Sequence, residues 1–355
     1  MTNSTISDVC AWSHSAGDVA AFMAYYVIMP MHFVFGLCGY SLCFVAFCKK
    51  AKEEAAFGYQ IIVTVTETIE VITYALLVVT FYWFSGAEGR DGVVWFRSSY
   101  ACMWFAAHIA FPLVNMFISL SVLMALAAAV DRIFALGKPF SYKQINHRKH
   151  QAIACAICSF VAISSSIFDC FRFFPQLGEK NLYHLAVDEE YTSSLTAASL
   201  SHLRNAIRLV GALSLIASNV IMVTMYQRHV KKVGQMKATK TNEAKKRQED
   251  QQKVLLLLAV FESLFNFLSM VVLSSYYVAV YASPTFYDCR SHFFGSLVDA
   301  ALEIFDICDF YVVFALSKNF RQMIYESTPC LKRWAANAQV ASGVAVTVAS
   351  QRSAQ

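Results

Sequence analysis

The sequence predicts an all-α membrane protein, a bundle of seven transmembrane helices followed by a short amphipathic eighth helix. Only 15% of the 355 residues are charged, whereas a soluble domain carries about 25%. The apolar residues gather into seven blocks, and each block reaches the roughly 20 residues that a helix needs to cross a bilayer. The charges lie between these blocks and form no basic face, so the net charge of +5 does not indicate nucleic-acid binding.

These blocks define the spans and the division of the chain. The first 18 residues are polar, and the first block is too long for the core of a cleavable signal peptide. We expect spans at 20–47, 57–84, 100–130, 151–171, 205–227, 253–281 and 292–317. The chain then divides into an extracellular N-terminus at 1–19, a transmembrane domain at 20–317, a membrane-parallel helix at 318–332 and a disordered cytoplasmic tail at 333–355.

The positive charges set the expected orientation. Of the 29 Lys and Arg, 22 lie in the four segments 48–56, 131–150, 228–253 and 318–355. Short segments rich in Lys and Arg stay in the cytoplasm, so we expect the N-terminus outside. Asn3, in Asn3-Ser4-Thr5, then lies where N-glycosylation can occur.

Four of the 11 cysteines lie at or near the expected outer face, where disulfides persist. They are Cys10, Cys102, Cys170 and Cys289, and they allow three pairings. We favour a disulfide between Cys102 and Cys170, which leaves Cys10 with Cys289.

Two motifs mark the cytoplasmic ends of spans three and seven. Span three ends in Asp131-Arg132-Ile133, and Pro139 and Tyr142 follow in the next loop. Span seven ends in Asp309-Phe310-Tyr311-Val312-Val313, and Phe320-Arg321 begins seven residues beyond Val313. This arrangement resembles the Asp-Arg-Tyr box and the end of helix seven in the rhodopsin-like (class A) G-protein-coupled receptors.

Further positions extend the resemblance, and others depart from it. Trp95 precedes Cys102 by seven residues, and Cys330 follows Phe320 by ten, where many receptors carry a palmitoylated cysteine. Span six has neither the usual Trp nor the usual Pro. A divergent chain this rich in Phe and Cys is similar to the nematode serpentine chemoreceptors.

The resemblance implies a cytoplasmic switch. Asp131 would restrain Arg132 at rest, and ligand binding would shift the population to a state in which Arg132 meets a heterotrimeric G protein. The implied coupling residues are Asp131, Arg132, Asp309, Phe320 and Arg321.

The resemblance also implies a polar core that holds an allosteric sodium ion. A hard cation prefers oxygen ligands. The candidate oxygen donors are Glu67, Glu70, Ser121, Asp306 and Asp309.

Acidic residues run along span seven at intervals of four, three and three, which places Asp299, Glu303, Asp306 and Asp309 on one helical stripe. Charges inside a membrane are costly, so this stripe should face the bundle interior. We place a ligand pocket towards the outside, lined by Trp104, His108, Asn115, Arg208, Asp299 and Glu303.

Arg208 has two readings. In the first, Arg208 has a functional role and either contacts an acidic ligand or pairs with Asp299 or Glu303. In the second, its side chain only extends to the nearby membrane surface. The ligand is a small molecule or a peptide. Val114 takes the place of the amine-binding Asp, and residues 292–317 contain no Lys for a retinal Schiff base, so neither a biogenic amine nor retinal is favoured.

We therefore expect a non-enzymatic plasma-membrane receptor, with a chemosensory role, whose partners are an extracellular ligand, a heterotrimeric G protein and membrane lipid. A neuropeptide receptor of the same fold is one alternative. An ion- or proton-coupled transporter or channel is another, because intramembrane acids also build ion paths. A seven-span hydrolase would need a metal site of His and carboxylate, and only His32 and His108 lie well within a span.

Overall fold

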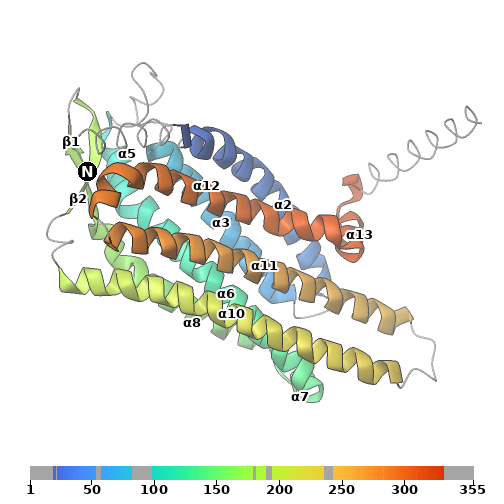
Figure 1. The fold of residues 1–355 in the computed structure, drawn as a ribbon. Helices are drawn as coiled ribbons and strands as arrows, with labels where there is room; N and C mark the ends of the chain where they lie inside the picture. The colour runs from blue at the N-terminus through green and yellow to red at the C-terminus, as the bar shows by residue number, and fades with distance from the viewer. Residues whose placement is uncertain are drawn as a thin grey trace, which may run out of the picture.

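The structure, a computed structural model, describes residues 19–20, 22–52, 57–81, 98–178, 181–188, 194–235, 243–282 and 284–331. Within these ranges seven long helical segments lie side by side as one bundle (Figure 1). They are α2 (Met29–Lys50), α3 (Phe57–Phe81), α5 with α6 (Tyr100–Phe105 and Phe111–Gly137), α8 (His147–Ser166), α10 (Leu195–Gln235), α11 (Glu243–Ala282) and α12 (Pro284–Leu316). The predicted order of helical blocks is present, although α10, α11 and α12 are longer than the apolar blocks that predicted them.

Five of these segments are long and apolar enough to cross a membrane, judged by length and composition over the described residues. They cover Tyr26–Lys50, Tyr100–Gly137, His147–Phe171, His202–Arg228 and Leu256–Tyr276. The two remaining helices, α3 and α12, carry the acidic residues of the bundle interior, and their crossing of the membrane stays a prediction.

Two segments of π-helix interrupt the α-helical geometry. Met23–Ile28 precedes α2, and Ala106–Ala110 joins α5 to α6. A proline follows each, Pro30 in the first turn of α2 and Pro112 in the first turn of α6. Proline has no backbone N–H to donate, so the preceding turn must change its hydrogen bonding. The wider turn at Ala106–Ala110 therefore lies near the N-terminal end of the apolar segment Tyr100–Gly137.

A β-hairpin, which the all-α prediction missed, follows α8. After a 3₁₀ segment at Ile167–Phe171, strand β1 (Phe173–Leu177) pairs antiparallel with β2 (Tyr183–Val187). In the turn, Asn181 has a φ of 56°, a left-handed conformation that asparagine tolerates. Phe173 packs edge-on against Phe111, with ring centroids 4.8 Å apart, so the hairpin is held to the N-terminal end of α6.

The hairpin marks one end of the bundle, and two short helices mark the other (Figure 1). These are α7 (Pro139–Lys143) and α13 (Lys318–Ser327). If the charge-based orientation is adopted, the hairpin lies outside and α7 and α13 lie at the cytoplasmic end.

The predicted eighth helix is present as α13 but ends at Ser327 rather than at residue 332. The Ser317 side chain accepts a hydrogen bond from the backbone N–H of Phe320 and so caps the helix start. The helix stops because Thr328 precedes Pro329, and a residue before proline disfavours helical geometry; Thr328 has φ −121° and ψ 93°.

The largest buried apolar cluster ties α13 to the bundle. It contains Cys43, Ala46, Phe47, Phe57, Val254, Leu258, Phe310, Val313, Phe320, Met323 and Ile324. Phe320 has no exposed surface, and Lys49 Nζ donates to the carbonyl oxygen of Glu326 over 2.8 Å. The base of α2 and the end of α12 therefore hold α13 from two sides.

Gly39 allows α2 and α12 to approach closely at this end. A Cβ atom at position 39 would lie 2.9 Å from the ring of Phe310, closer than side chains tolerate. Glycine at this position therefore lets the Phe310 ring pack on the backbone of α2.

Candidate functional site

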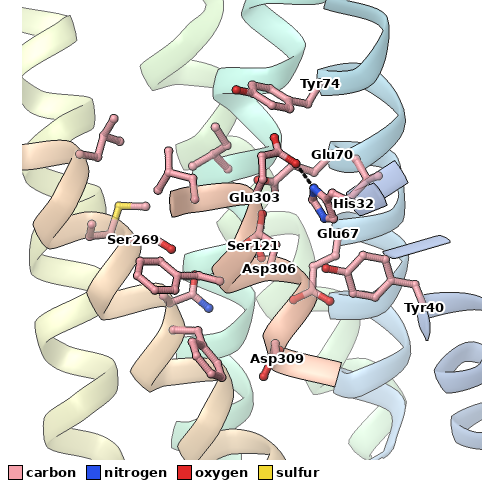
Figure 2. Close-up of a pocket in the computed structure, with 18 residues that line it drawn as sticks. His32, Tyr40, Glu67, Glu70, Tyr74, Ser121, Ser269, Glu303, Asp306 and Asp309 are labelled. Atoms are coloured by element: carbon pink, nitrogen blue, oxygen red, sulfur yellow. Dashed lines mark hydrogen bonds and ion pairs between the residues drawn. The ribbon is translucent and has the colours of Figure 1, made fainter. Parts of the chain in front are cut away.

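A polar cavity of about 80 Å³ lies in the middle of the bundle, between α2, α3, α6, α11 and α12 (Figure 2). A buried water needs roughly 10–15 Å³ of such space, so the cavity has room for several water molecules. Its polar lining includes His32, Tyr40, Glu67, Glu70, Ser121, Asn266, Ser269, Glu303, Asp306 and Asp309. Five carboxylates from two helices thus surround one small enclosed volume.

The stripe of acids on α12 is brought to this cavity over most of its length. Glu303, Asp306 and Asp309 line it, and their spacing places them on one face of the helix. Asp299, one turn nearer the hairpin, does not line it. Glu303, Asp306 and Asp309 therefore face the bundle interior, as predicted for the stripe.

His32 of α2 pairs with the deepest-buried of these acids. Its Nδ1 atom is hydrogen-bonded to Oε2 of Glu303, and the two residues are 2% and 4% exposed. Figure 2 shows the two side chains meeting across the cavity wall. Breaking a buried pair by removing one partner costs about 3–5 kcal/mol, so this contact is a strong link between the first and last long helices.

The predicted oxygen donors of a sodium site all line the cavity. Glu67 and Glu70 come from α3, Ser121 from α6, and Asp306 and Asp309 from α12. Within the described residues, no group of three or more His, Cys, Asp and Glu is arranged to hold a metal ion directly. The donors therefore line one cavity, and sodium binding stays a prediction.

Arg208 lies next to this region on α10 and is bound to α6. Its Nε donates to Ser119 Oγ over 2.9 Å, and one terminal nitrogen donates to the carbonyl oxygen of Asn115 and, over 3.2 Å, to its side-chain oxygen. Only 3% of Arg208 is exposed, so its side chain does not reach the membrane surface. Glu303 was one of the two acidic residues expected to pair with Arg208, and it is hydrogen-bonded to His32.

A second buried ion pair lies above Arg208, nearer the hairpin. Arg204 of α10 is paired with Asp169 of the 3₁₀ segment, and both side chains are 2% exposed. This pair fixes the N-terminal part of α10 to the segment that leads into the hairpin.

The residues predicted to form one ligand pocket lie in different places. Asn115 and Arg208 contact each other beside the cavity, and Glu303 lines it. His108 instead lies between α6 and α8, where its Nδ1 is hydrogen-bonded to the carbonyl oxygen of Cys170. Trp104 packs on His108 with ring centroids 5.0 Å apart and is 43% exposed. These side chains therefore do not line one common pocket.

The structure does not confirm the predicted disulfide, because Cys102 and Cys170 are both free in it. The carbonyl of Cys170 is bonded to His108, which lies six residues beyond Cys102. Cys10 lies outside the described residues, as does the side chain of Cys289.

At the opposite end, the Asp131-Arg132 motif is built into the helix end. The hydroxyl of Tyr142, on α7, donates to Asp131 Oδ2 over 2.8 Å, and its ring packs on His147 with centroids 4.3 Å apart. Arg132 is 8% exposed. The motif therefore lies at the packed junction of α6, α7 and α8.

The other predicted positions at this end are found on α13 and beyond it. Phe320 is buried in the apolar cluster, and Arg321 donates to the carbonyl oxygen of Phe314 over 2.9 Å. Cys330 is exposed, which palmitoylation requires. Asn3 lies outside the described residues.

Sequence reasoning did not foresee three contacts, those of His32 with Glu303, Ser119 with Arg208 and Tyr142 with Asp131. Two of these residues carried a signal, because His32 is a histidine within an apolar block and Tyr142 follows the Asp131-Arg132 motif. The link of His32 to Glu303 spans 271 residues of sequence, a distance over which no helical periodicity operates.

The fold is similar to that of squid rhodopsin. The crystal structure of squid rhodopsin matches with a TM-score of 0.60 and 14% identity, over 88% of this chain and 87% of that chain. No protein-family model matches the sequence, and no curated protein matches it. The chain therefore has a rhodopsin-like fold, with helices suited to a membrane.

Proposed function

We propose that the protein is a receptor of the rhodopsin-like (class A) type that transmits binding of an extracellular ligand to a heterotrimeric G protein. The observation that carries the proposal is the cavity of carboxylates at the centre of a receptor-like bundle, between the hairpin end and the Asp131-Arg132 end. A change in the charge or hydration of this cavity would alter how α2, α3 and α12 pack and so reach the far end.

The role assigned to each end follows from the residues there. The hairpin end, with Arg208 bonded to α6, is where an acidic or polar ligand would act, and Arg208 would exchange its bonds to Asn115 and Ser119 for the ligand. At the other end, Asp131 and Arg132 would respond to movement of α6 against α7, with Phe320 and Arg321 as part of the coupling face. We assign a chemosensory role, a plasma-membrane location and an outside N-terminus on sequence grounds.

The proposal extends to modifications and to an ion. Asn3 would be glycosylated, Cys330 would be palmitoylated, and a sodium ion in the cavity would act as an allosteric ligand of the resting state. These expectations rest on the resemblance and on the oxygen-rich lining of the cavity.

The test is a screen of chemical and peptide libraries on cells that express the chain with a promiscuous G protein, followed by nucleotide exchange with purified components. An identified ligand should speed exchange. Arg132→Ala should abolish this while ligand binding is kept, and Arg148→Ala, an exposed arginine at the same end on α8, should leave exchange unchanged. Exchange that is equal in wild type and Arg132→Ala would contradict the proposal.

A transporter or channel is the second candidate, because buried carboxylates such as those around the cavity also occur in proton and ion paths. It would give ion current or substrate uptake in membranes that contain no G protein. Glu70→Gln would then reduce transport, whereas a receptor would show no transport in either form.

A further inference from the structure

A second, apolar groove of about 200 Å³ opens between α6 and α8, at their hairpin ends. Its walls are mostly aliphatic, and they include Ile109, Pro112, Leu113, Met116, Ile163 and Ile167. Ile109, Ile163 and Ile167 are exposed. Because α6 and α8 both belong to segments suited to a membrane, this groove faces the acyl chains of the bilayer rather than the central cavity.

One polar atom in the groove lacks a hydrogen-bond partner. Ser166 is 2% exposed and lines the groove, and within the described residues its hydroxyl has no hydrogen bond. Ser166 stands at the start of the 3₁₀ segment, where a serine usually caps the backbone, yet its side chain makes no capping bond. A buried hydroxyl without a hydrogen-bond partner destabilises the folded protein by about 1–3 kcal/mol. A ligand that forms a hydrogen bond with Ser166 would remove this cost, which favours binding.

His108 adds a second polar group at the same end of the groove. Its Nδ1 is held by the carbonyl oxygen of Cys170, which leaves Nε2 as the other hydrogen-bonding atom of the ring. Ser166 and His108 thus lie towards the hairpin end, whereas Met116 and Ile163 lie deeper in the bundle. The groove is polar at its hairpin end and apolar further along the helices. A lipid in the outer leaflet has the same arrangement, with its polar head outermost and its apolar body deeper in the membrane.

The head of such a lipid must be uncharged. Among the described residues, no Lys or Arg lines the groove. Nearby cations are engaged elsewhere, because Arg172 lies 5.2 Å from the centre of the Phe173 ring and Arg204 is paired with Asp169. A phosphate or carboxylate head would therefore be buried without a counter-charge, at a high desolvation cost.

We propose that this groove is a binding site for a membrane sterol, with the sterol hydroxyl bonded to Ser166 and His108 and the ring system against Pro112, Met116 and Ile163. A sterol fits because its polar part is a single hydroxyl and the rest is a rigid apolar body. Occupation would brace α6 against α8 at the level of the π-helical turn Ala106–Ala110, independently of any ligand in the central cavity.

The site is tested with a photoreactive cholesterol analogue, which carries a diazirine in the ring system, and the full chain in phosphatidylcholine nanodiscs. Peptide mapping should place the label within residues 109–116 and 163–170. Unlabelled cholesterol should compete, and the analogue that lacks the hydroxyl should compete about fivefold less well, the loss expected for one or two neutral hydrogen bonds.

Matched variants separate the site from general lipid contact. Ser166→Ala should reduce specific labelling about fivefold. Ser165→Ala, an adjacent buried serine whose hydroxyl already donates to the carbonyl oxygen of Ala162 over 3.0 Å, should leave labelling unchanged. Ile163→Trp should fill the groove and abolish labelling, and thermal unfolding of each variant shows whether it is folded.

Three outcomes would overturn the proposal. Label spread evenly over the helices would mean that the groove does not select sterol. Equal labelling of wild type and Ser166→Ala would mean that the hydroxyl has no part in binding. Stronger competition by diacylglycerol than by cholesterol would assign the groove to a different uncharged lipid.

Discussion

His32 of α2 and Glu303 of α12 form a buried hydrogen-bonded pair that joins the first long helix to the last. The ring of His32 also lies over Gly36, one turn further along α2. The pair therefore depends on the partner helix and on the space that the glycine leaves.

His32→Ala should lower the free energy of unfolding by about 3 kcal/mol, because the buried Glu303 carboxyl loses its partner. The double variant His32→Ala/Glu303→Ala should cost less than the sum of the two single variants. Unfolding in detergent micelles measures both, and His150→Ala, an exposed histidine on α8, should have little effect. Additive costs would show that the pair contributes no coupling.

Gly36→Ala should destabilise the protein, since a Cβ atom there would lie 2.9 Å from Cδ2 of His32 and would displace the ring from Glu303. In the His32→Ala background the same change should cost almost nothing. Gly295→Ala is the control, because its Cβ would come no closer than 3.2 Å to its nearest neighbour, the Tyr276 hydroxyl. If Gly36→Ala cost the same in both backgrounds, the ring contact would not be the cause.

Asp169 and Arg204 should behave as one unit at the hairpin end. Asp169→Asn or Arg204→Met alone should cost about 3–5 kcal/mol, because each leaves a buried charge without its partner. The double variant Asp169→Leu/Arg204→Met should recover most of this loss. Denaturant unfolding measures the three values, and Arg148→Met, in an exposed arginine, serves as the control.

Tyr142→Phe should remove the hydrogen bond to Asp131 and lower stability by about 1 kcal/mol. If the proposed coupling role is right, the freed Asp131 should also alter nucleotide exchange in the absence of ligand. Phe140→Ala, in a residue of α7 that is 85% exposed, should change stability little. Unfolding and basal exchange are measured on the same preparations, and an unchanged stability would contradict the contact.

Sodium should stabilise the protein relative to choline at equal ionic strength, and Asp309→Asn should remove the effect. At tenfold excess over its dissociation constant an ion that binds only the folded state adds about 1.4 kcal/mol. Asp299→Asn is the matched control, since Asp299 lies on the same helix but does not line the cavity. A sodium effect that persists in Asp309→Asn would place the ion elsewhere.

Some of this structure could be predicted from the sequence because it is encoded locally. Apolar block length predicts the helices, and the intervals between Glu303, Asp306 and Asp309 predict a shared face, which the cavity contains. The start of α13 follows from Ser317 and the buried Phe320. Each of these depends on residues within a few turns of one another.

Other features depend on how distant segments meet and have no local signal. No pattern near Arg208 indicates that α6 supplies Ser119, although Asn115 was expected in the same pocket as Arg208. Cys102 and Cys170 are compatible with a disulfide by their order in the chain, but both are free in the structure, where the Cys170 carbonyl contacts His108. The hairpin has strands of only five residues each, too short to stand out between helices.

The pairing of His32 with Glu303 has a consequence for biosynthesis. During translation α2 leaves the ribosome 271 residues before the carboxyl that its histidine needs, so the newly inserted helix carries an unpaired polar ring among lipid or chaperone. Only when α12 arrives is that ring satisfied. A chain that ends before α12 should therefore be less stable than the full chain, because its His32 ring has no carboxyl partner from α12.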